Sequence, residues 1–131
     1  MPEENIELVR RMVEAIDSGD LPRELITDDF ELKNATTAVA DATYVGYEGG
    51  LQWRQDMFDV VENAHFSLDE VVTTGPDYVV IANSLAGHGA SSGVPVHMRW
   101  TSVLWFRDGK ICRAAGFNTR AEALQAVGSA G

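Results

Sequence analysis

The apolar residues of this chain recur with two different periods, and the change of period separates a helix-rich first half from a strand-rich second half. Ile6, Val9, Val13 and Ile16 follow helical spacing and predict a helix over residues 3–17. The next elements predicted are a short helix over 21–26, a strand over 30–35, an irregular loop over 36–47 and a helix over 48–63.

The second half alternates apolar and polar residues as strands do. It predicts strands over 65–74, 78–88, 96–106 and 111–117, and a final helix over 120–127. Asp108 and Gly109 form the turn pair of a tight hairpin, and Thr119 is a favourable N-cap. Strands joined by short turns are antiparallel, and helices precede them here. The order therefore predicts an α+β fold with helices packed on one face of a curved sheet.

The amino-acid composition and net charge limit the classes of molecule that this chain is expected to bind. The 131 residues are 45% hydrophobic and 23% charged, as expected for one globular domain over residues 1–131. A net charge of −10 disfavours nucleic acid and anionic membrane surfaces, both of which attract clustered Lys and Arg. No apolar run approaches the roughly 20 residues of a membrane span. A single cysteine, Cys112, allows no intrachain disulfide, so a reducing compartment, the cytoplasm, is expected.

Three segments carry a resemblance to a known superfamily. They are Tyr44-Val-Gly-Tyr-Glu with Trp53 seven residues after Gly46, Ser92-Gly-Val-Pro-Val-His-Met-Arg-Trp, and Val103-Leu-Trp-Phe-Arg-Asp-Gly-Lys-Ile followed by Phe117 and the helix from Arg120. The chain resembles the nuclear transport factor 2-like, or ketosteroid isomerase-like, superfamily, and its SnoaL-like family in particular. The resemblance implies a cone-shaped, curved antiparallel or mixed sheet wrapped around three to four helices and enclosing a pocket.

The resemblance also suggests which strand faces point inward. The implied ligand-binding residues are Met12, Leu32, Trp53, Met57, Ile81, Asn83, Leu85, Met98 and Trp100. On the last strand, Cys112, Ala114 and Gly116 would point the same way, followed by Asn118. The set is mostly apolar, with uncharged polar groups that a dry core does not tolerate cheaply. We therefore expect a pocket for a small apolar organic molecule, without a cofactor.

Departures from the family pattern limit the chemistry. Where ketosteroid isomerase has its carboxylate base and its two oxyanion donors, this chain has Asn34, Met12 and Ser102. An amide cannot abstract a proton and a thioether cannot donate a hydrogen bond, so that mechanism is not expected. The catalytic candidates that remain are neutral donors at Asn34, Ser102 and Asn118, which can polarise a carbonyl. An epoxide-hydrolase mechanism is disfavoured because Arg99 points outward without an inward carboxylate.

Other polar residues are interpreted as structural. The three histidines, His65, His88 and His97, lack the spacing of a metal site. Arg54 either meets an anionic group at the pocket rim or, more in keeping with its long side chain, reaches solvent. The outward sheet face is too apolar to meet water as one patch, which predicts a homodimer through that face. It carries Val80, Ala82, Thr101, Val103, Trp105, Ala115 and Phe117.

Three functions stay open at this point. The first is an enzyme, such as a cyclase, isomerase or dehydratase acting on a small apolar biosynthetic intermediate. The second is a ligand-binding protein without catalysis, which the missing acid and base favour. The third is a scaffold or dimerisation domain that uses the apolar sheet face. Fold alone does not choose among them.

Overall fold

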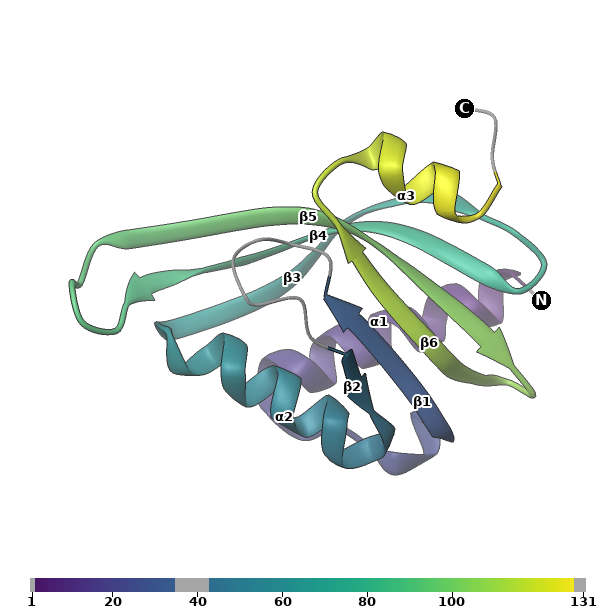
Figure 1. Ribbon diagram of the computed structural model, residues 1–131, viewed down its shortest axis with the longest axis horizontal. Coiled ribbons are helices and arrows are strands. Elements are labelled where there is room, and N and C mark those ends of the chain that lie inside the picture. The colour runs from purple at the N-terminus through teal and green to yellow at the C-terminus, as the bar shows by residue number, and fades with distance from the viewer. Residues whose placement is uncertain (1, 35–42, 129–131) are drawn as a thin grey trace.

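The computed structural model describes residues 2–34 and 43–128, which fold into three α-helices, one short 3-10 helix and six strands (Figure 1). In chain order these are α1 (Pro2–Ser18), the 3-10 helix (Arg23–Leu25), β1 (Ile26–Asn34), β2 (Thr43–Val45), α2 (Gly46–Asp59), β3 (Val61–Thr74), β4 (Tyr78–Gly89), β5 (Pro95–Arg107), β6 (Lys110–Phe117) and α3 (Arg120–Ala126).

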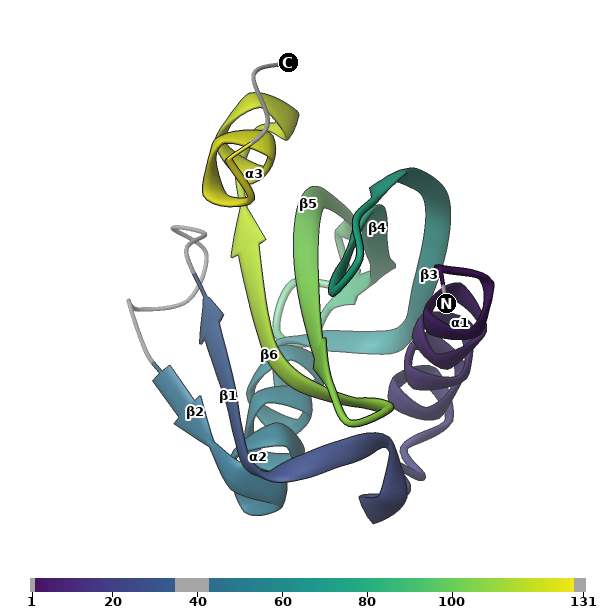
Figure 2. The same cartoon turned by 90° about the vertical axis from the view of Figure 1, so that its right-hand side faces the viewer.

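The six strands form one curved, unclosed sheet in the order β2-β1-β6-β5-β4-β3. β1 and β6 are parallel and the other neighbours are antiparallel, so the sheet is mixed. Helices α1 and α2 lie on one side of the sheet and α3 lies on the other (Figures 1 and 2). The predicted fold class, a cone-shaped α+β fold, is confirmed. One detail differs, since only α1 and α2 lie on the enclosed side.

Helix α1 is fixed to α2 by a side chain that the sequence analysis assigned to solvent or to the pocket rim. Arg54 of α2 donates from Nε to the carbonyl oxygen of Ile16 at 2.6 Å and from a terminal nitrogen to that of Asp17 at 3.3 Å. Its guanidinium also lies 4.0 Å from the ring centroid of Phe58. The last turn of α1 contains no basic residue of its own. Arg54 therefore supplies the cation that the negative end of a helix favours.

Several element boundaries differ from the predictions where strand pairing, rather than local pattern, decides them. The expected helix over 21–26 is a 3-10 turn, and β1 begins earlier than predicted, at Ile26. The short strand β2 lies within the stretch expected to be a loop, and residues 35–42 of that stretch lie outside the described part. Helix α2 ends at Asp59, so Val60, expected on its apolar face, is 58% exposed.

The predicted hairpin turn at Asp108-Gly109 is confirmed. Both residues have positive φ, 55° and 75°. A tight turn of this kind needs positive φ at both central positions, and its twist matches that of the flanking strands. It connects β5 to β6 with Arg107 opposite Lys110.

Cys112 does not point inward as expected. Along β6 the pairing moves from Arg113, opposite Trp105, to Ile111, opposite Phe106. The strand thus holds one extra residue, a β-bulge at Cys112, and a bulge interrupts the alternation of side chains. Ile111 takes the inward position and is fully buried, whereas Cys112 is half-buried.

The apolar outward face of the sheet is covered in part by the chain itself. Val80 of β4 and Val103 of β5 are fully buried together with Ala123 of α3, and Trp105 and Phe117 pack against them. Figure 2 shows α3 on this side of the sheet. The predicted homodimer rested on this face being bare. Because α3 provides much of its cover, that argument is weakened, and the homodimer stays a prediction.

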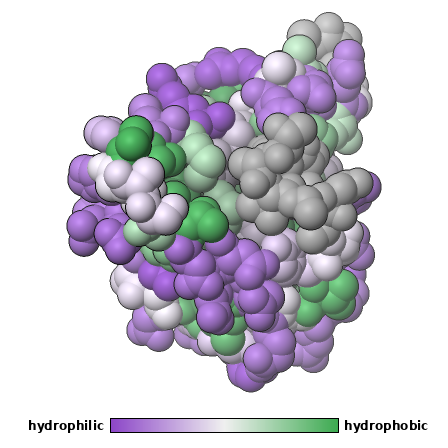
Figure 3. Space-filling view, turned by 60° about the vertical axis from the view of Figure 1, so that its left-hand side comes forward, coloured by the Kyte–Doolittle hydropathy of each residue, from purple (hydrophilic) through white to green (hydrophobic). Residues whose placement is uncertain are grey.

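The described surface is mainly polar. In the view of Figure 3, hydrophilic residues dominate and hydrophobic ones appear in a few separate places. The most exposed large hydrophobic side chains are Val45, Val60 and Val94, which come from three different parts of the chain. Within residues 2–34 and 43–128, no helix has the length and apolar character needed to cross a bilayer.

Candidate functional site

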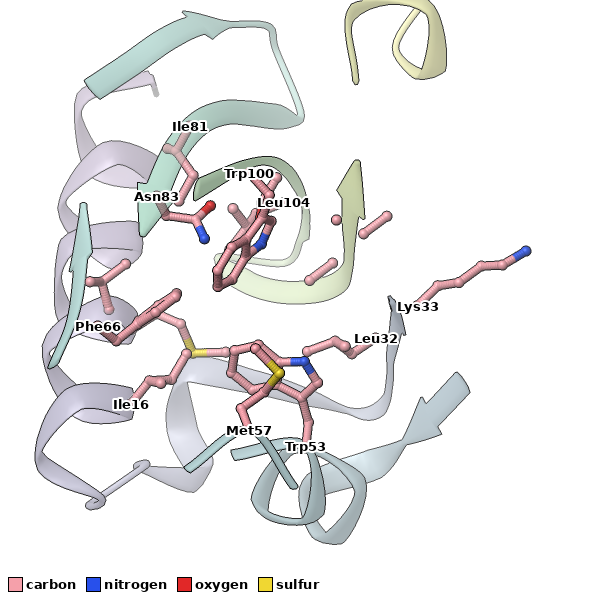
Figure 4. A pocket seen from close by; sticks show the side chains of 16 residues that line it. Ile16, Leu32, Lys33, Trp53, Met57, Phe66, Ile81, Asn83, Trp100 and Leu104 are labelled. Carbon is pink, nitrogen blue, oxygen red and sulfur yellow. The ribbon is translucent and has the colours of Figure 1, made fainter. Parts of the chain in front are cut away.

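A cavity of about 60 Å³ lies between the inner sheet face and the two enclosed helices (Figure 4). Most of the side chains that line it are aliphatic or aromatic, and α1, α2 and all strands except β2 contribute to it. The lining residues are Met12, Val13, Ile16, Leu32, Lys33, Trp53, Met57, Phe66, Ile81, Asn83, Trp100, Ser102, Leu104, Ala114, Ala115 and Gly116.

The strand register explains why these side chains meet. Leu68, Asn83 and Trp100 lie opposite one another across β3, β4 and β5. The next inward row pairs Ile81 with Ser102 across β4 and β5. Paired residues on antiparallel strands point to the same face, so each row presents its side chains together.

The structure places most of the expected ligand-binding residues around this cavity and moves two of them away. Met12, Leu32, Trp53, Met57, Ile81, Asn83 and Trp100 line it. Leu85 and Met98 do not, because they pair with each other one row further along β4 and β5. Leu85 is fully buried and belongs to the core, with Met98 packed against that core.

The three catalytic candidates have different positions. Ser102 lines the cavity and is half-buried. Asn118 does not line it, because β6 ends at Phe117 and Asn118 lies exposed in the turn before α3. Thr119, the next residue, caps α3 by accepting a hydrogen bond from the backbone of Glu122, as predicted. The backbone of Asn34 pairs with Gly116, but its side chain lies outside the described part.

Sequence reasoning missed the contribution of an aromatic residue on β3. Phe66 lines the cavity and contacts the two tryptophans there. Its ring centroid is 5.9 Å from that of Trp53, edge to face, and 5.8 Å from that of Trp100. Val13 and Ile16 of α1 were also missed, although Ile16 lies one helical turn from Met12 and Val13 directly follows Met12. The inward face of β3 was the missing information, since bulges interrupt its alternation.

Asn83 is the polar residue that stands out in this cavity. Its side chain is 1% exposed, and among the described residues neither its Nδ2 nor its Oδ1 has a hydrogen-bond partner. Figure 4 shows the amide and Trp100 pointing into the same space, with Trp53 and Met57 opposite. Buried amides are almost always hydrogen-bonded, because water is lost on burial and must be replaced. Both ends of this amide are therefore available to something inside the cavity.

Charged groups are nearly absent from the described lining. Lys33 alone is ionisable, and Figure 4 shows its side chain extending away from the cavity. Among the described lining residues there is thus no carboxylate or imidazole to serve as a general acid or base. The described residues also contain no cluster of His, Cys, Asp and Glu suited to a metal.

The perturbed ionisable groups lie elsewhere. Burial, together with a hydrogen bond to Asp56, raises the pKa of Tyr44 to about 12. The Tyr44 hydroxyl donates to Asp56 Oδ2 at 2.7 Å, and this contact lowers the pKa of Asp56. The Arg107 guanidinium, hydrogen-bonded to Asp29, lowers the pKa of that carboxyl. Since none of these groups lines the cavity, they hold the fold together rather than mark a site.

Solved structures share this architecture at low identity. A ketosteroid isomerase-like protein from Catenulispora acidiphila, in complex with trimethylamine, is 20% identical, with a TM-score of 0.72 and coverage of 94% of this chain and 93% of that one. TerC, co-crystallised with polyporic acid, is 17% identical, with a TM-score of 0.73 and coverage of 96% and 99%. A putative SnoaL-like polyketide cyclase from Jannaschia is 20% identical, with a TM-score of 0.68 and coverage of 99% and 94%.

At such identities the structural neighbours show the fold alone, the nuclear transport factor 2-like cone. No curated protein matches the chain. The family is decided by the sequence itself, because the model of the SnoaL-like domain matches residues 9–114, from the middle of α1 into β6. Since this span covers most of the chain and nearly all of the cavity lining, this chain is a member of the SnoaL-like family.

Proposed function

We propose that this protein binds a small, uncharged and mostly apolar organic molecule in the cavity between the inner sheet face and helices α1 and α2. The observation that carries the proposal is the buried amide of Asn83, which lines an apolar cavity with neither of its polar atoms paired among the described residues. A leucine there would fill similar volume without the desolvation penalty of an unpaired amide. The desolvation penalty of Asn83 is offset when a ligand completes the hydrogen bonds of its amide.

The lining determines the chemical character of the ligand. Trp53, Phe66 and Trp100 offer aromatic surfaces around the space, and the methionines at positions 12 and 57 adapt to irregular shapes. An ion would lose its hydration there without an opposite charge among the described side chains that point inward. The site therefore favours a neutral molecule with little polar surface.

The volume of the cavity limits the size of the ligand. The volume of about 60 Å³ is well below the roughly 300–1,000 Å³ of pockets for drug-sized ligands. A molecule with a handful of heavy atoms suits it, and a larger one would require Met12, Met57 or the half-buried Trp100 to change rotamer. Two structural neighbours were crystallised with trimethylamine and polyporic acid, which supports a ligand role for a cavity of this fold.

A second candidate is turnover of the bound molecule by a cyclase, isomerase or dehydratase reaction. It is favoured by the hydroxyl of Ser102 on the cavity lining, diagonal to Asn83 across β4 and β5. Diagonal neighbours lie about 7–8 Å apart, so one small ketone can contact both residues. Two neutral donors near one carbonyl would stabilise the enolate oxygen, while water takes up the α-proton and later returns a proton to the same carbon.

The binding proposal is tested by titrating the ¹⁵N-labelled protein with cyclopentanone and following the indole N–H signals by NMR. The chain has three tryptophans, and Trp105 lies on the outer face, where Arg113 stacks on it 4.6 Å from the ring centroid. We expect saturable shifts at Trp53 and Trp100, with Trp105 unchanged. Equal shifts at all three, or none, would contradict the proposal.

A filled cavity provides the matched control. Ala114→Val adds two methyl groups to the cavity lining, whereas Ala82→Val adds the same groups to β4, where the register turns residue 82 to the outer face. The first change should weaken cyclopentanone binding at least about tenfold by removing space, and the second should not. Exchange of the ketone's α-protons for deuterium in D₂O separates the two candidates. Accelerated exchange that Ser102→Ala abolishes means catalysis, and unaccelerated exchange means binding alone.

A further inference from the structure

The unpaired amide of Asn83 specifies more than an apolar ligand. We infer that the ligand carries a hydrogen-bond acceptor and a donor on neighbouring atoms, as a lactam or a cis secondary amide does, and that Asn83 binds both at once. This inference rests on the proposed binding function and names the class of molecule that the same cavity takes. It starts from the fact that, in the part of the chain that the structure describes, both Nδ2 and Oδ1 lack partners, and not only one of them.

A ligand with an acceptor alone leaves half of this amide unsatisfied. A ketone, ester or ether accepts from Nδ2, but Oδ1 then stays buried without a donor, and the cost of desolvating it is not recovered. A carboxylate would bring a second negative oxygen against Oδ1. A lactam has its C=O and N–H side by side in one plane, and this edge matches the edge of a carboxamide.

The surroundings of Asn83 offer little help from the protein. Its cross-strand neighbours are Leu68 and Trp100, and its neighbours on the same face of β4 are Ile81 and Leu85. The three aliphatic side chains neither donate nor accept, and an indole N–H can only donate. β4 is paired with a strand on each side at this point, although a bulge lies next to Leu68 on β3. Since no group within residues 2–34 and 43–128 is bonded to either end of the amide, the ligand is the source of the acceptor and donor pair.

Water is the competing occupant. A cavity of about 60 Å³ has room for several waters, which can pair with an amide if they find further polar partners. Ser102 is such a partner on the next inward row, but the rest of the nearby lining is apolar. Waters held this weakly are readily displaced by a molecule that restores both hydrogen bonds and also covers the apolar surface.

The test uses three five-membered rings of nearly equal size. 2-Pyrrolidinone carries both C=O and N–H, γ-butyrolactone replaces the N–H by a ring oxygen, and cyclopentanone has the carbonyl alone. Their dissociation constants are measured by NMR titration with the wild type and with Asn83→Leu. The three rings differ in hydration, and this difference affects their dissociation constants equally in both proteins. It therefore cancels when the ratio of dissociation constants for two rings is compared between Asn83→Leu and the wild type.

We expect Asn83→Leu to weaken 2-pyrrolidinone about tenfold more than it weakens γ-butyrolactone or cyclopentanone. Thr101→Val is the control, since Thr101 is buried on the adjacent strand but faces away from the cavity. It should change none of the ratios. Equal weakening of all three rings by Asn83→Leu would overturn the inference while leaving the binding function in place. If no ring shifts Trp53 or Trp100, the binding function itself fails.

A measurement on the wild type keeps the inference testable if Asn83→Leu does not fold. The Nδ2 protons of Asn83 give their own NMR signals, and hydrogen bonding moves a proton downfield. Binding of 2-pyrrolidinone should move the Asn83 side-chain signals and protect its own N–H from exchange with water, whereas γ-butyrolactone should move the Asn83 signals less. Ring binding that leaves the Asn83 signals at their free positions would overturn the inference.

Discussion

Asn83 and Ser84 are consecutive residues of β4 and are almost equally buried, but they differ in whether their polar side chains are hydrogen-bonded. Asn83 points into the cavity at 1% exposure, and neither of its polar atoms has a partner among the described residues. Ser84 points to the outer face at 6% exposure and donates from Oγ to Asp69 Oδ1 at 3.2 Å. Asp69 in turn lies 4.0 Å from Arg99.

The contrast indicates that Ser84 has a structural role and Asn83 a functional one, although both lie on the same strand. The outer face satisfies its buried polar group with side chains from β3 and β5, as packed protein surfaces usually do. On the inner face, the amide that lines the cavity has no hydrogen-bond partner among the described residues. Such a group lowers the stability of the empty protein, and natural proteins tolerate such losses mainly at sites of function.

The largest effect is expected from detaching α3 from the outer face. Ala123→Asp places a charge against Val80 and Val103, all three residues being fully buried. Burying that charge or undocking the helix should lower the free energy of unfolding by about 2–4 kcal/mol, measured in urea. Ala121→Asp, on the exposed side of α3, is the matched control and should cost little. Equal losses in the two variants would mean that α3 does not cover this face.

The opposite sign is expected on the inner face. Asn83→Leu removes an unpaired amide and should raise the free energy of unfolding by about 1–3 kcal/mol while abolishing preferential lactam binding. The free energy is measured by urea unfolding without ligand. A lower stability would show that the amide has a structural partner, and the contrast with Ser84 would disappear.

A smaller loss tests whether the outer polar group is structural. Asp69→Ala leaves the Ser84 hydroxyl without its acceptor and should lower stability by about 1 kcal/mol. Ser84→Ala removes both the hydroxyl and the need for an acceptor. The double variant Asp69→Ala/Ser84→Ala should therefore lose less stability than the two single variants lose in sum. Neither change should affect cyclopentanone binding. Strict additivity would indicate that the two side chains do not interact.

The smallest effect concerns Tyr44, which packs against the main core and yet, unlike Asn83, is paired. Its pKa is raised to about 12 from an ordinary value near 10, so the unfolded chain loses this proton first. The stabilisation is complete below about pH 10 and is lost as the pH rises toward 12. Tyr44→Phe should therefore show a shallower fall in the free energy of unfolding between pH 9 and 11. Identical slopes for both proteins would contradict the raised pKa.

Local patterns predicted the parts of the fold whose causes are local. The apolar spacing in α1, the Thr119 cap of α3 and the Asp108-Gly109 turn all depend on residues close together in the chain. The misplaced boundaries depend on distant partners. β2 exists because it pairs with β1, and β3 is joined to the end of α1 where Phe66 N donates to Asp17 Oδ1 at 2.8 Å. No window of sequence around these residues contains that information.

The features of the candidate site likewise fall into those that could be predicted from the sequence and those that could not. Alternation along a strand predicts which residues share a face, and the resemblance to the SnoaL-like family indicated that the apolar face with scattered amides and hydroxyls points inward. The three-dimensional arrangement was needed to show that Asn83 has no partner among the described residues, that Asn118 lies in a turn and that α3 covers Val80 and Val103. Hydrogen bonding and cover are set by residues that the fold brings together from distant positions, and a single sequence does not record which of them meet.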